Sequence, residues 1–292
     1  MARYTGQEAA REHLVDVARH VVHAVHKAPQ MTGRLKLSTE IITGDDLAPI
    51  IEGLGVLAKV SQFVHWDYTT FKDYYEAGNP PVLVLIGADC TVSEMSWNCG
   101  ACGFATCAEF NRYARENRGT GLIGGGPCCN WKVLDLGMAC DWGCAAAWQY
   151  NVDNRIQGSS GGVAGTLGYL PGCSNVLGLP LGPSREMVWY SREIMNKKFD
   201  YQQHVNTMLA SIPTHFMAFP GGGRPVFKSS DRWWEANSLI TWGPNEQAEE
   251  KLYEVVMEMA ELAAKHGPAI AERYKKVSNP GQNPESRIQN PE

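Results

Sequence analysis

Three cysteines with the spacing C-x2-C-x4-C constrain this chain more than any other feature of its sequence. They are Cys99, Cys102 and Cys107, within the segment CGACGFATCAEF. This spacing lets three thiolates converge on one iron-sulfur cluster while a short loop folds around the inorganic sulfides. Gly100 and Gly103 lie in that loop, and glycine permits the left-handed backbone angles that bring amide N–H groups close to the sulfides. The segment therefore predicts a cluster-binding loop, which still needs a fourth ligand.

The fourth ligand is expected from the adjacent pair Cys128 and Cys129. A turn at Gly126 and Pro127 precedes the pair and can return the chain to the loop, and the residues alone leave both thiols open as the ligand. Eight of the nine cysteines fall within residues 90–144. A disulfide framework normally uses an even number of cysteines, so this density indicates metal binding in a reducing compartment. A structural zinc site stays open as an alternative, although zinc knuckles more often pair two C-x2-C units.

The charge balance and the hydropathy exclude two classes of partner. The chain has 26 basic and 31 acidic side chains, a net charge of −5, and no basic block, which disfavours nucleic acid and anionic membranes. The N-terminal residues lack a signal-peptide pattern, and no apolar run approaches the roughly 18 residues that cross a bilayer. We therefore expect a globular, cytoplasmic protein that binds neither nucleic acid nor membrane.

Hydrophobic periodicity predicts the main helices and strands. Helices are predicted over residues 9–27, 45–62, 108–117 and 131–150. A strand within residues 34–44 and a continuously apolar strand at 82–90, covered on both faces, follow from the same pattern. A long amphipathic helix is predicted over 247–276, interrupted near Pro268.

Several segments are open to two interpretations. The glycine-rich residues 158–172 form either a loop close to a ligand or a surface linker, and residues 119–126 are interpreted as a hinge. Cys140 and Cys144 lie four apart on one helix face, where they either bind a second metal or pack as small hydrophobic residues. Trp233 and Trp234 are expected to anchor an interface.

The cysteine segment resembles the small iron-sulfur module of the corrinoid iron-sulfur protein. The span from Ala10 to about Arg192 is similar to an uncharacterised prokaryotic "ferredoxin-domain" family that is common in anaerobes. The shared marks are APxxxG at residues 28–33, ITG at 42–44, CGACGF, GPxC, K-x-x-D-L-G at 132–137, NVDNRI at 151–156 and LGLPLG at 177–182. This resemblance implies that Cys129 is the fourth ligand and that Cys128 is an extra thiol.

A more distant resemblance is to the flavin nitroreductase-like fold. It implies an α+β protein with a mixed sheet and packed helices, an inserted iron-sulfur loop, and a homodimer formed through the helix at 131–150. It also implies FMN as a second cofactor. Arg155, Asn154, Asn151 and Gly33 are the residues that would hold a flavin or another anion, because a guanidinium offers a planar fork of donors. A structural network from helix to loop explains the same polar residues equally well.

These observations lead to one functional hypothesis and two alternatives. Residues 1–195 are expected to form one domain, with the iron-sulfur insertion at about 90–130. A C-terminal extension at 196–278 is expected to pack on this domain or on a partner. Residues 279–292 are expected to form a tail. The chain is predicted to be an oxidoreductase of anaerobic metabolism, or a subunit of one, with a single 4Fe-4S cluster and either a redox partner protein or a small-molecule substrate. The alternatives are an electron-transfer or accessory subunit of a larger complex, and a structural zinc protein.

Overall fold

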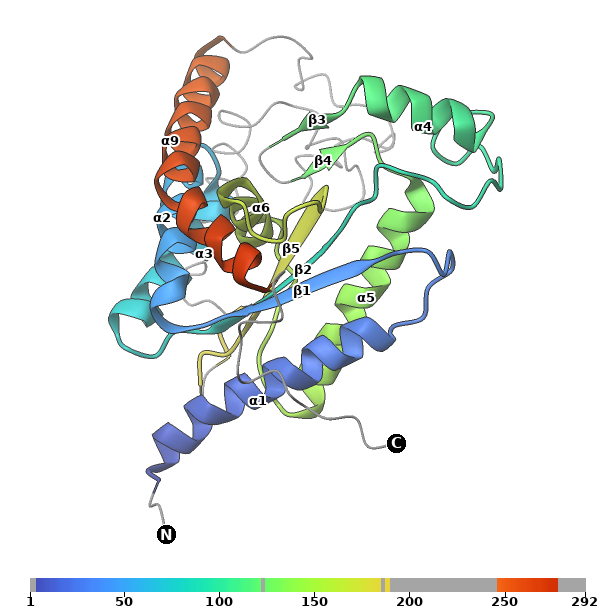
Figure 1. Cartoon of the computed structure of the whole chain (residues 1–292). Helices are drawn as coiled ribbons and strands as arrows, with labels where there is room; N and C mark the ends of the chain where they lie inside the picture. The colour runs from blue at the N-terminus through green and yellow to red at the C-terminus, as the bar shows by residue number, and fades with distance from the viewer. Residues whose placement is uncertain (1–3, 122–123, 185–186, 190–245, 278–292) are drawn as a thin grey trace, which may run out of the picture.

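A three-stranded antiparallel sheet lies at the centre of the protein. The structure is a computed structural model that describes residues 4–121, 124–184, 187–189 and 246–277 (Figure 1). The strands β1 (Leu37–Ile42), β2 (Val82–Ala88) and β5 (Asn175–Leu181) lie in the order β1-β2-β5. Both pairings are antiparallel, so within the described residues the expectation of a mixed sheet was wrong. Helices combined with an antiparallel sheet make this an α+β fold, as predicted.

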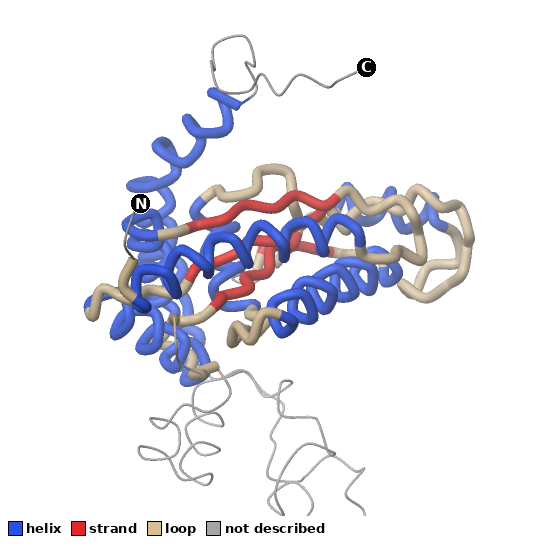
Figure 2. Tube along the Cα trace, turned by 90° about the horizontal axis from the view of Figure 1, so that it is seen from below, coloured by secondary structure: helices blue, strands red, loops and turns tan. Residues whose placement is uncertain are grey.

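The central strand β2 is buried along its whole length, which agrees with the continuously apolar sequence of residues 82–88. Successive side chains of a strand point to opposite faces, so the strand contributes to two apolar cores. Val84 and Ile86 join the core on one face, and Leu83 and Leu85 join the core on the other. Helices cover both faces of the sheet (Figure 2).

Two long helices, α1 (Gly6–Lys27) and α5 (Asn130–Gln149), cover the first face. Val17, Val21 and Val25 are fully buried and follow the helical spacing that predicted α1. The close packing of α5 on α1 depends on Gly143, because a Cβ atom there would lie 3.0 Å from Val25 Cγ2. Both helices therefore formed where the sequence predicted them, and small residues of α5 set the distance between them.

The second face is covered by shorter helices and by the helix near the C-terminus. These are the 3₁₀ helix η1 (Gly44–Leu47), α2 (Ala48–Leu57), α3 (Gln62–Glu76), α6 (Gly158–Leu167) and α9 (Glu246–Val277). The single helix expected at 45–62 is divided: α2 ends at Leu57, and a new helix begins after the Ser61 side chain accepts a hydrogen bond from Val64 N. That N-cap starts α3, so the aromatic residues of 63–75 lie on a separate helix.

Helix α6 overturns both interpretations of the segment 158–172 as a loop or a linker. Its glycines are poor helix formers, but the helix packs directly on β5. A Cβ atom on Gly161 would lie 2.4 Å from Leu177 Cα, so no side chain fits between the two backbones at this point. Tertiary contact selected glycine here, and the burial of Val163 and Leu167 offsets the low helix propensity.

Helix α9 packs on α2 and α6 and remains continuous through Pro268, where the sequence predicted an interruption. Met259 and Leu262 before the proline and Ile270 after it are buried in the same core. Anchoring on both sides of the proline offsets the missing backbone hydrogen bond. Salt bridges border the contact, including Lys265 Nζ to Glu52 Oε1 at 2.8 Å.

The cysteine module, which we define as residues 91–121 and 124–129, extends from one end of the sheet (Figure 1). It contains α4 (Cys107–Glu116) and two short paired strands, β3 (Gly119–Thr120) and β4 (Gly125–Gly126). Gly125 N donates to Ser174 O at 2.7 Å, which ties the hairpin to the start of β5. Residues 119–121 and 124–126 are therefore a docked hairpin, not the expected hinge.

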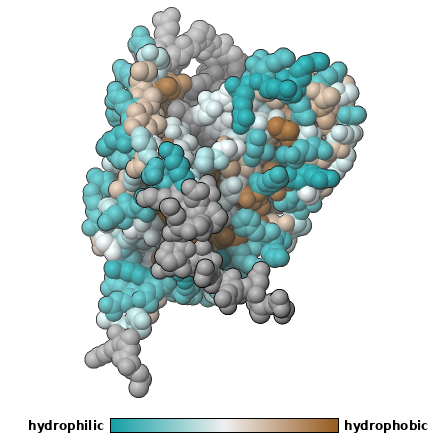
Figure 3. Space-filling model, viewed as in Figure 1, coloured by the Kyte–Doolittle hydropathy of each residue, from teal (hydrophilic) through white to brown (hydrophobic). Residues whose placement is uncertain are grey.

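The surface in the view of Figure 3 is mainly hydrophilic, with hydrophobic patches among the polar residues. None of the helices in the described parts of the chain is long and apolar enough to cross a bilayer. The predictions for residues 201–242, including Trp233 and Trp234, and for the tail at 279–292 lie outside the described residues.

Candidate metal centre

Four cysteines border one cavity in the cysteine module. The cavity encloses about 260 Å³, part of it open to solvent. Its cysteines are Cys99, Cys102, Cys107 and Cys129, which come from the loop, from the start of α4 and from the residue just before α5. The other lining residues are Ser93, Met95, Trp97, Ala101, Asn130 and Trp131. The chain thus assembles a four-thiol site from two segments that are separated in sequence by α4 and the hairpin.

The loop backbone before α4 has several residues in the left-handed region. Positive φ angles occur at Ser96 (54°), Asn98 (50°), Gly100 (73°) and Gly103 (87°). The backbone N–H groups of residues 96–98 converge on the Cys107 thiol, and concave rows of N–H groups are common at phosphate and iron-sulfur sites. The glycines at 100 and 103 meet the left-handed requirement predicted from the sequence.

The Cys107 thiol receives most of these donors. It is the first residue of α4, a helix begun by a capping box in which Thr106 and Glu109 exchange hydrogen bonds. The hydroxyl of Ser93 and the backbone N–H groups of Asn98 and its two preceding residues hold the pKa of Cys107 below its ordinary value, against a smaller opposing effect of burial. Donors directed at this sulfur favour the thiolate, which is the form that binds metal.

Ser93 gives a further indication that the cavity suits a polar group. Its side-chain oxygen is buried and has no partner of ordinary hydrogen-bond geometry among the described residues, although its proximity lowers the pKa of the Cys107 thiol. The backbone at this position is fixed by Asn111, whose Oδ1 accepts from Ser93 N at 2.7 Å and whose Nδ2 donates to Ser93 O at 2.8 Å. A rigidly held hydroxyl beside a thiol in a cavity is suited to donate to a sulfur-rich group, so the donor set fits an iron-sulfur cluster.

Cys129 closes the cavity from the side of the helix–sheet body. It is buried together with Phe110 and Ala114 in a small apolar cluster, and its backbone N–H donates to Cys90 O at 2.7 Å. Cys90 lies two residues after the end of β2, so this bond fixes Cys129 to the central strand. The Cys90 thiol is itself buried, which raises its pKa to about 12, and we interpret it as a structural residue.

Trp131 is the closest aromatic partner of the cysteine loop. Its indole Nε1–H donates to Cys99 Sγ at 3.1 Å, and its ring meets the Trp97 ring edge-on with centroids 6.4 Å apart. Cys99 is exposed, and half of the Trp97 surface is exposed as well. This side of the cavity therefore faces solvent, whereas Cys129 closes the buried side.

Cys128 points away from the cavity. Its thiol donates to Gly125 O at 3.0 Å and accepts from Asn175 Nδ2 at 3.2 Å. It packs against the apolar core beneath α1 and α5 and does not line the cavity. The two neighbouring thiols thus face different environments, and Cys129 is the one that borders the cavity.

One buried cation lies near the site. Lys132 is located one helical turn after Cys129, and its Nζ is 3.2 Å from Glu94 Oε2, while its own side chain is almost completely buried. A positive charge in this position stabilises the negative charge of thiolates and sulfides, and Glu94 offsets part of that charge. The charge of Lys132 also lowers the pKa of Asp89, although burial of Asp89 acts in the opposite direction and hydrogen bonds from Thr91 contribute more.

The residues predicted to hold a flavin do not come together. Gly33 belongs to the loop after α1, and its neighbour Thr32 donates its backbone N–H to Asp135 Oδ2 at 3.0 Å, near the start of α5. Asn151 follows the opposite end of α5. Positions 135 and 151 are sixteen residues apart, which corresponds to about 24 Å along a helix. This distance is too long for the ring system of one flavin to touch both ends of α5.

The polar residues after α5 act within the fold. The Asp153 carboxylate accepts the backbone N–H groups of Val188 and Trp189, the latter at 2.9 Å. Asn154 Nδ2 donates to Val152 O at 3.0 Å, and Arg155 Nη1 donates to Trp189 O at 3.4 Å. These contacts fit the structural network that the sequence left open as the alternative to a cofactor site.

Cys140 and Cys144 have the environment of structural thiols. Both pack in the core beneath α1 and α5. Burial raises the pKa of Cys140 to about 12 and that of Cys144 to about 11, so both thiols are held neutral. In the described residues, no three histidine, cysteine or acidic side chains approach closely enough to hold a single metal ion, and this includes the four cysteines that border the cavity.

The sequence interpretation missed the polar and aromatic groups around the thiols. Ser93 lies outside the cysteine motif, and only the tertiary structure brings its hydroxyl to Cys107. Trp131 could have been noticed, because it follows the cysteine pair and begins a helix that must pass the loop. Lys132 was noted only as part of a family resemblance, and its burial beside the site was not expected.

Comparisons with known proteins agree in part with the resemblance stated above. A model of a family described as "Uncharacterized protein containing a ferredoxin domain" matches residues 125–192. An uncharacterized protein of Archaeoglobus fulgidus is 26% identical over 174 residues, which cover 59% of this chain and 88% of the relative. No solved structure matches the chain.

The family match supports an iron-sulfur electron-transfer protein in general terms. The match begins at residue 125. It therefore includes Cys129 but not the other three cysteines of the cavity. The ferredoxin-domain resemblance is therefore confirmed over residues 125–192. The nitroreductase resemblance gains no support from these comparisons.

Proposed function

We propose that Cys99, Cys102, Cys107 and Cys129 bind one 4Fe-4S cluster, and that the protein is an oxidoreductase of anaerobic metabolism or a subunit of one. The observation that carries this proposal is the shared cavity of the four thiols. Three of them have the spacing of an iron-sulfur loop, and four thiolates are the usual ligand set of such a cluster. The ferredoxin-domain match of residues 125–192 adds support from a separate source.

The residues around the thiols have distinct roles in this proposal. A bound cluster supplies one-electron chemistry, which no protein side chain here offers. The N–H groups of the loop, the Ser93 hydroxyl and the Trp131 indole donate to sulfur, and donors of this kind stabilise the more negative, reduced state. Lys132 acts in the same direction through its charge, while the apolar cluster around Phe110 excludes water from the Cys129 side.

The exposed edge of the cavity favours direct contact with a partner. Cys99 and Trp97 reach solvent on the same side, so an electron can enter or leave there without crossing the body of the protein. This observation supports the second candidate function, an electron-transfer subunit that docks on a larger complex through the Cys99 edge. The two candidates differ in whether the chain has its own substrate.

FMN is a second proposed cofactor, and its presence is tested separately. Gly33 lies near one end of α5, and Asn151, Asn154 and Arg155 follow its other end. A flavin found in the protein would need a binding site other than the combination of these four residues within one chain. Resolved flavin bands in the visible spectrum would favour the enzyme, whereas a broad shoulder near the 400 nm region alone would favour the carrier.

The proposal is tested by purifying the protein without exposure to oxygen and measuring iron, acid-labile sulfide and zinc per chain. We expect about four irons and about four sulfides, and an electron paramagnetic resonance signal after reduction with dithionite. Stoichiometric zinc with no sulfide would instead support the structural zinc protein. A colourless protein with neither metal would contradict both assignments.

A further inference from the structure

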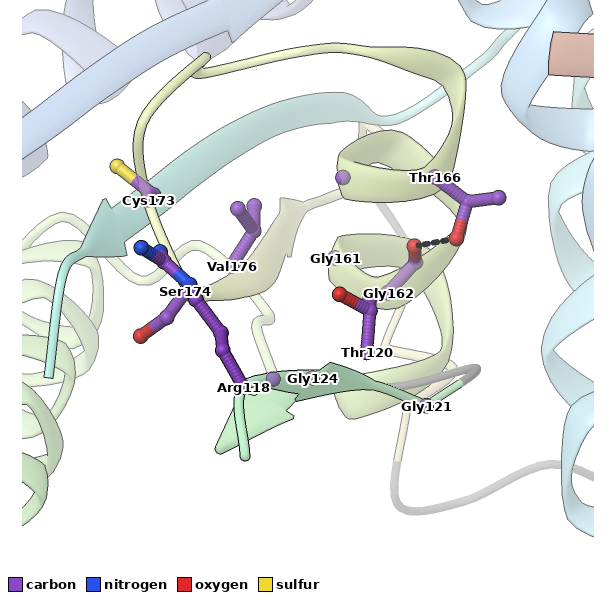
Figure 4. A pocket seen from close by; sticks show the side chains of 12 residues that line it. Arg118, Thr120, Gly121, Gly124, Gly161, Gly162, Thr166, Cys173, Ser174 and Val176 are labelled. Atoms are coloured by element: carbon purple, nitrogen blue, oxygen red, sulfur yellow. Dashed lines mark hydrogen bonds between the residues drawn. The ribbon is translucent and has the colours of Figure 1, made fainter. Parts of the chain in front are cut away.

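A second cavity lies between helix α6 and the β3–β4 hairpin (Figure 4). The hairpin and the preceding Arg118 form one wall, α6 forms the second, and the segment leading into β5 forms the third. About 450 Å³ of space lies between these walls, and part of that space is open solvent, so the cavity suits only a small ligand. The described residues that line it include no acidic side chain.

Arg118 is the group in this cavity that is suited to an anion. Its side chain extends along the wall that carries Ser174, and the Thr120 hydroxyl lies on the side of α6, where the Thr166 hydroxyl donates to Gly162 O at 3.0 Å (Figure 4). The ion pair of Arg118 with Asp89 has an N–O distance of 3.7 Å and is half-exposed, so it holds the guanidinium only weakly. A guanidinium has five N–H donors in a planar fork that matches a carboxylate or a phosphate.

Glycine shapes the opposite wall. Gly161 and Gly165 expose the backbone of α6 to the cavity, and Val176 of β5 closes the space behind them. Gly161 is required for contact between α6 and β5, whereas a Cβ atom on Gly165 would meet only Val176 Cγ2 at 3.5 Å, an ordinary contact. The wall at Gly165 therefore has room for a methyl group, which would lie against Val176, another residue that lines the cavity.

The cavity lies next to the four-cysteine site along the chain. Gly125 lines this cavity, and Cys129, four residues further on, lines the other. Four residues span at most about 14 Å even when fully extended, so the two cavities are within reach of direct electron transfer. The same hairpin connects both sites.

We propose that this second cavity binds a small molecule that carries a carboxylate or a phosphate, with Arg118 as its anchor. The effect of that molecule on the neighbouring cysteine site rests on the proposed function. The binding of that molecule does not rest on the proposed function, because the residues that line this cavity do not include the four thiols.

The binding part is tested by calorimetric titration of the anaerobically purified full-length protein with inorganic phosphate and, separately, with malonate. We expect saturable binding of at least one probe, and the probe that binds identifies the anion class. Arg118→Gln should weaken binding at least tenfold, the effect of losing hydrogen bonds to a charged group. Arg118→Lys should weaken it less, because an ammonium keeps the charge but loses the fork.

Matched variants separate this effect from general charge and from misfolding. Arg115→Gln removes the same charge from an exposed position on α4 and should bind as the wild type does. Gly165→Ala should raise the thermal midpoint while it weakens binding several-fold, because its methyl group occupies the cavity. Absence of saturable binding by both probes, or equal binding by Arg118→Gln and wild type, would overturn the proposal.

The effect on the cysteine site has a separate readout. In cluster-containing protein, the bound probe should alter the electron paramagnetic resonance signal of wild type and Arg115→Gln, and leave that of Arg118→Gln unchanged. An unaltered signal at saturating probe would reject the coupling between the two sites alone. Binding that persists in Cys102→Ser, or in a wild type without iron, would show that the anion site stands even where the cluster proposal fails.

Discussion

The helix–sheet body and the cysteine module are stabilised by different means. The body contains two large apolar cores, one on each face of the sheet, and its central strand is buried along its length. The module has one small cluster, in which only Phe110, Ala114 and Cys129 are buried. Each large side chain that is removed from water contributes about 1.5–3 kcal/mol, so the apolar contacts of the module alone offset little of the cost of ordering its loops.

This difference indicates that a bound metal group is part of the structure of the module but not of the body. Metal binding is coupled to folding where the ligands are brought together only in the folded state. The body should therefore fold without the cluster, whereas the loop before α4 should be ordered fully only when its thiols are ligated. Each of the following predictions tests one side of this comparison.

The largest expected effect is the loss of the cluster in Cys102→Ser. Serine cannot replace the thiolate, so iron and sulfide per chain should fall below about a quarter of the wild-type content. The far-UV circular dichroism and the main unfolding transition should change little, while amide hydrogen exchange within the module should accelerate. Unchanged iron would refute the site, and complete unfolding would refute the independence of the body.

The next largest effect concerns the body and uses two glycines of α6. Gly161→Ala places its Cβ atom 2.4 Å from Leu177 Cα, and this backbone overlap should cost about 3 kcal/mol of unfolding free energy or more. Gly165→Ala has room and should instead stabilise the helix by about 0.5–1 kcal/mol. Urea denaturation measures both. Equal stability of the two variants would show that α6 does not contact β5 as described.

A third prediction separates the two neighbouring thiols. Cys129→Ser should lose most of the iron, because its side chain borders the four-cysteine cavity. Cys128→Ser should retain nearly all of it, since that side chain contacts Gly125 O and Asn175 Nδ2 instead. Iron content per folded chain is the measurement for this matched pair. The reverse ranking would mean that the cysteine pair rotates when the cluster binds.

A fourth prediction tests the expected homodimer. Leu134, Trp142 and Trp148 are large apolar side chains exposed on α5, which is the helix expected to form the interface. Trp142→Glu should weaken self-association by about 2 kcal/mol, or roughly 30-fold, as is typical of a tryptophan at an interface. Light scattering over a concentration series measures this, with the exposed Tyr253→Glu on α9 as the control. A monomeric wild type would exclude the dimer.

The smallest expected effect is a shift of the cluster potential in Trp131→Phe. Phenylalanine keeps the aromatic packing but removes the Nε1–H donor to Cys99 Sγ. If the lost hydrogen bond favours the reduced state by about 1 kcal/mol, the midpoint potential falls by roughly 40 mV. Redox titration followed by electron paramagnetic resonance measures the shift, at unchanged iron content. A potential equal to that of wild type would show that the indole has no influence on the cluster.

Much of the body was predictable from periodicity. The valines of α1 and the continuous apolar run of β2 encode a helix and a buried strand directly, because burial on one face or on both faces leaves a distinct pattern. Helix α6 could not be predicted in the same way. Its glycines indicate a loop by their local propensity, and the reason for them is the backbone of β5, which is remote in sequence and adjacent only in space.

The sequence by itself determined the chemistry of the candidate site: the spacing of three cysteines, the glycines that allow the loop to bend, and a cysteine pair after a turn. Only the tertiary structure decided which member of the pair faces the cavity, that Ser93 and Trp131 donate to its thiols, and that Gly33 and Arg155 lie at opposite ends of α5. The physical reason is the sequence separation of the interacting residues. Motif spacing and backbone freedom are local properties, whereas the direction of a side chain depends on contacts between segments that meet only when the chain folds.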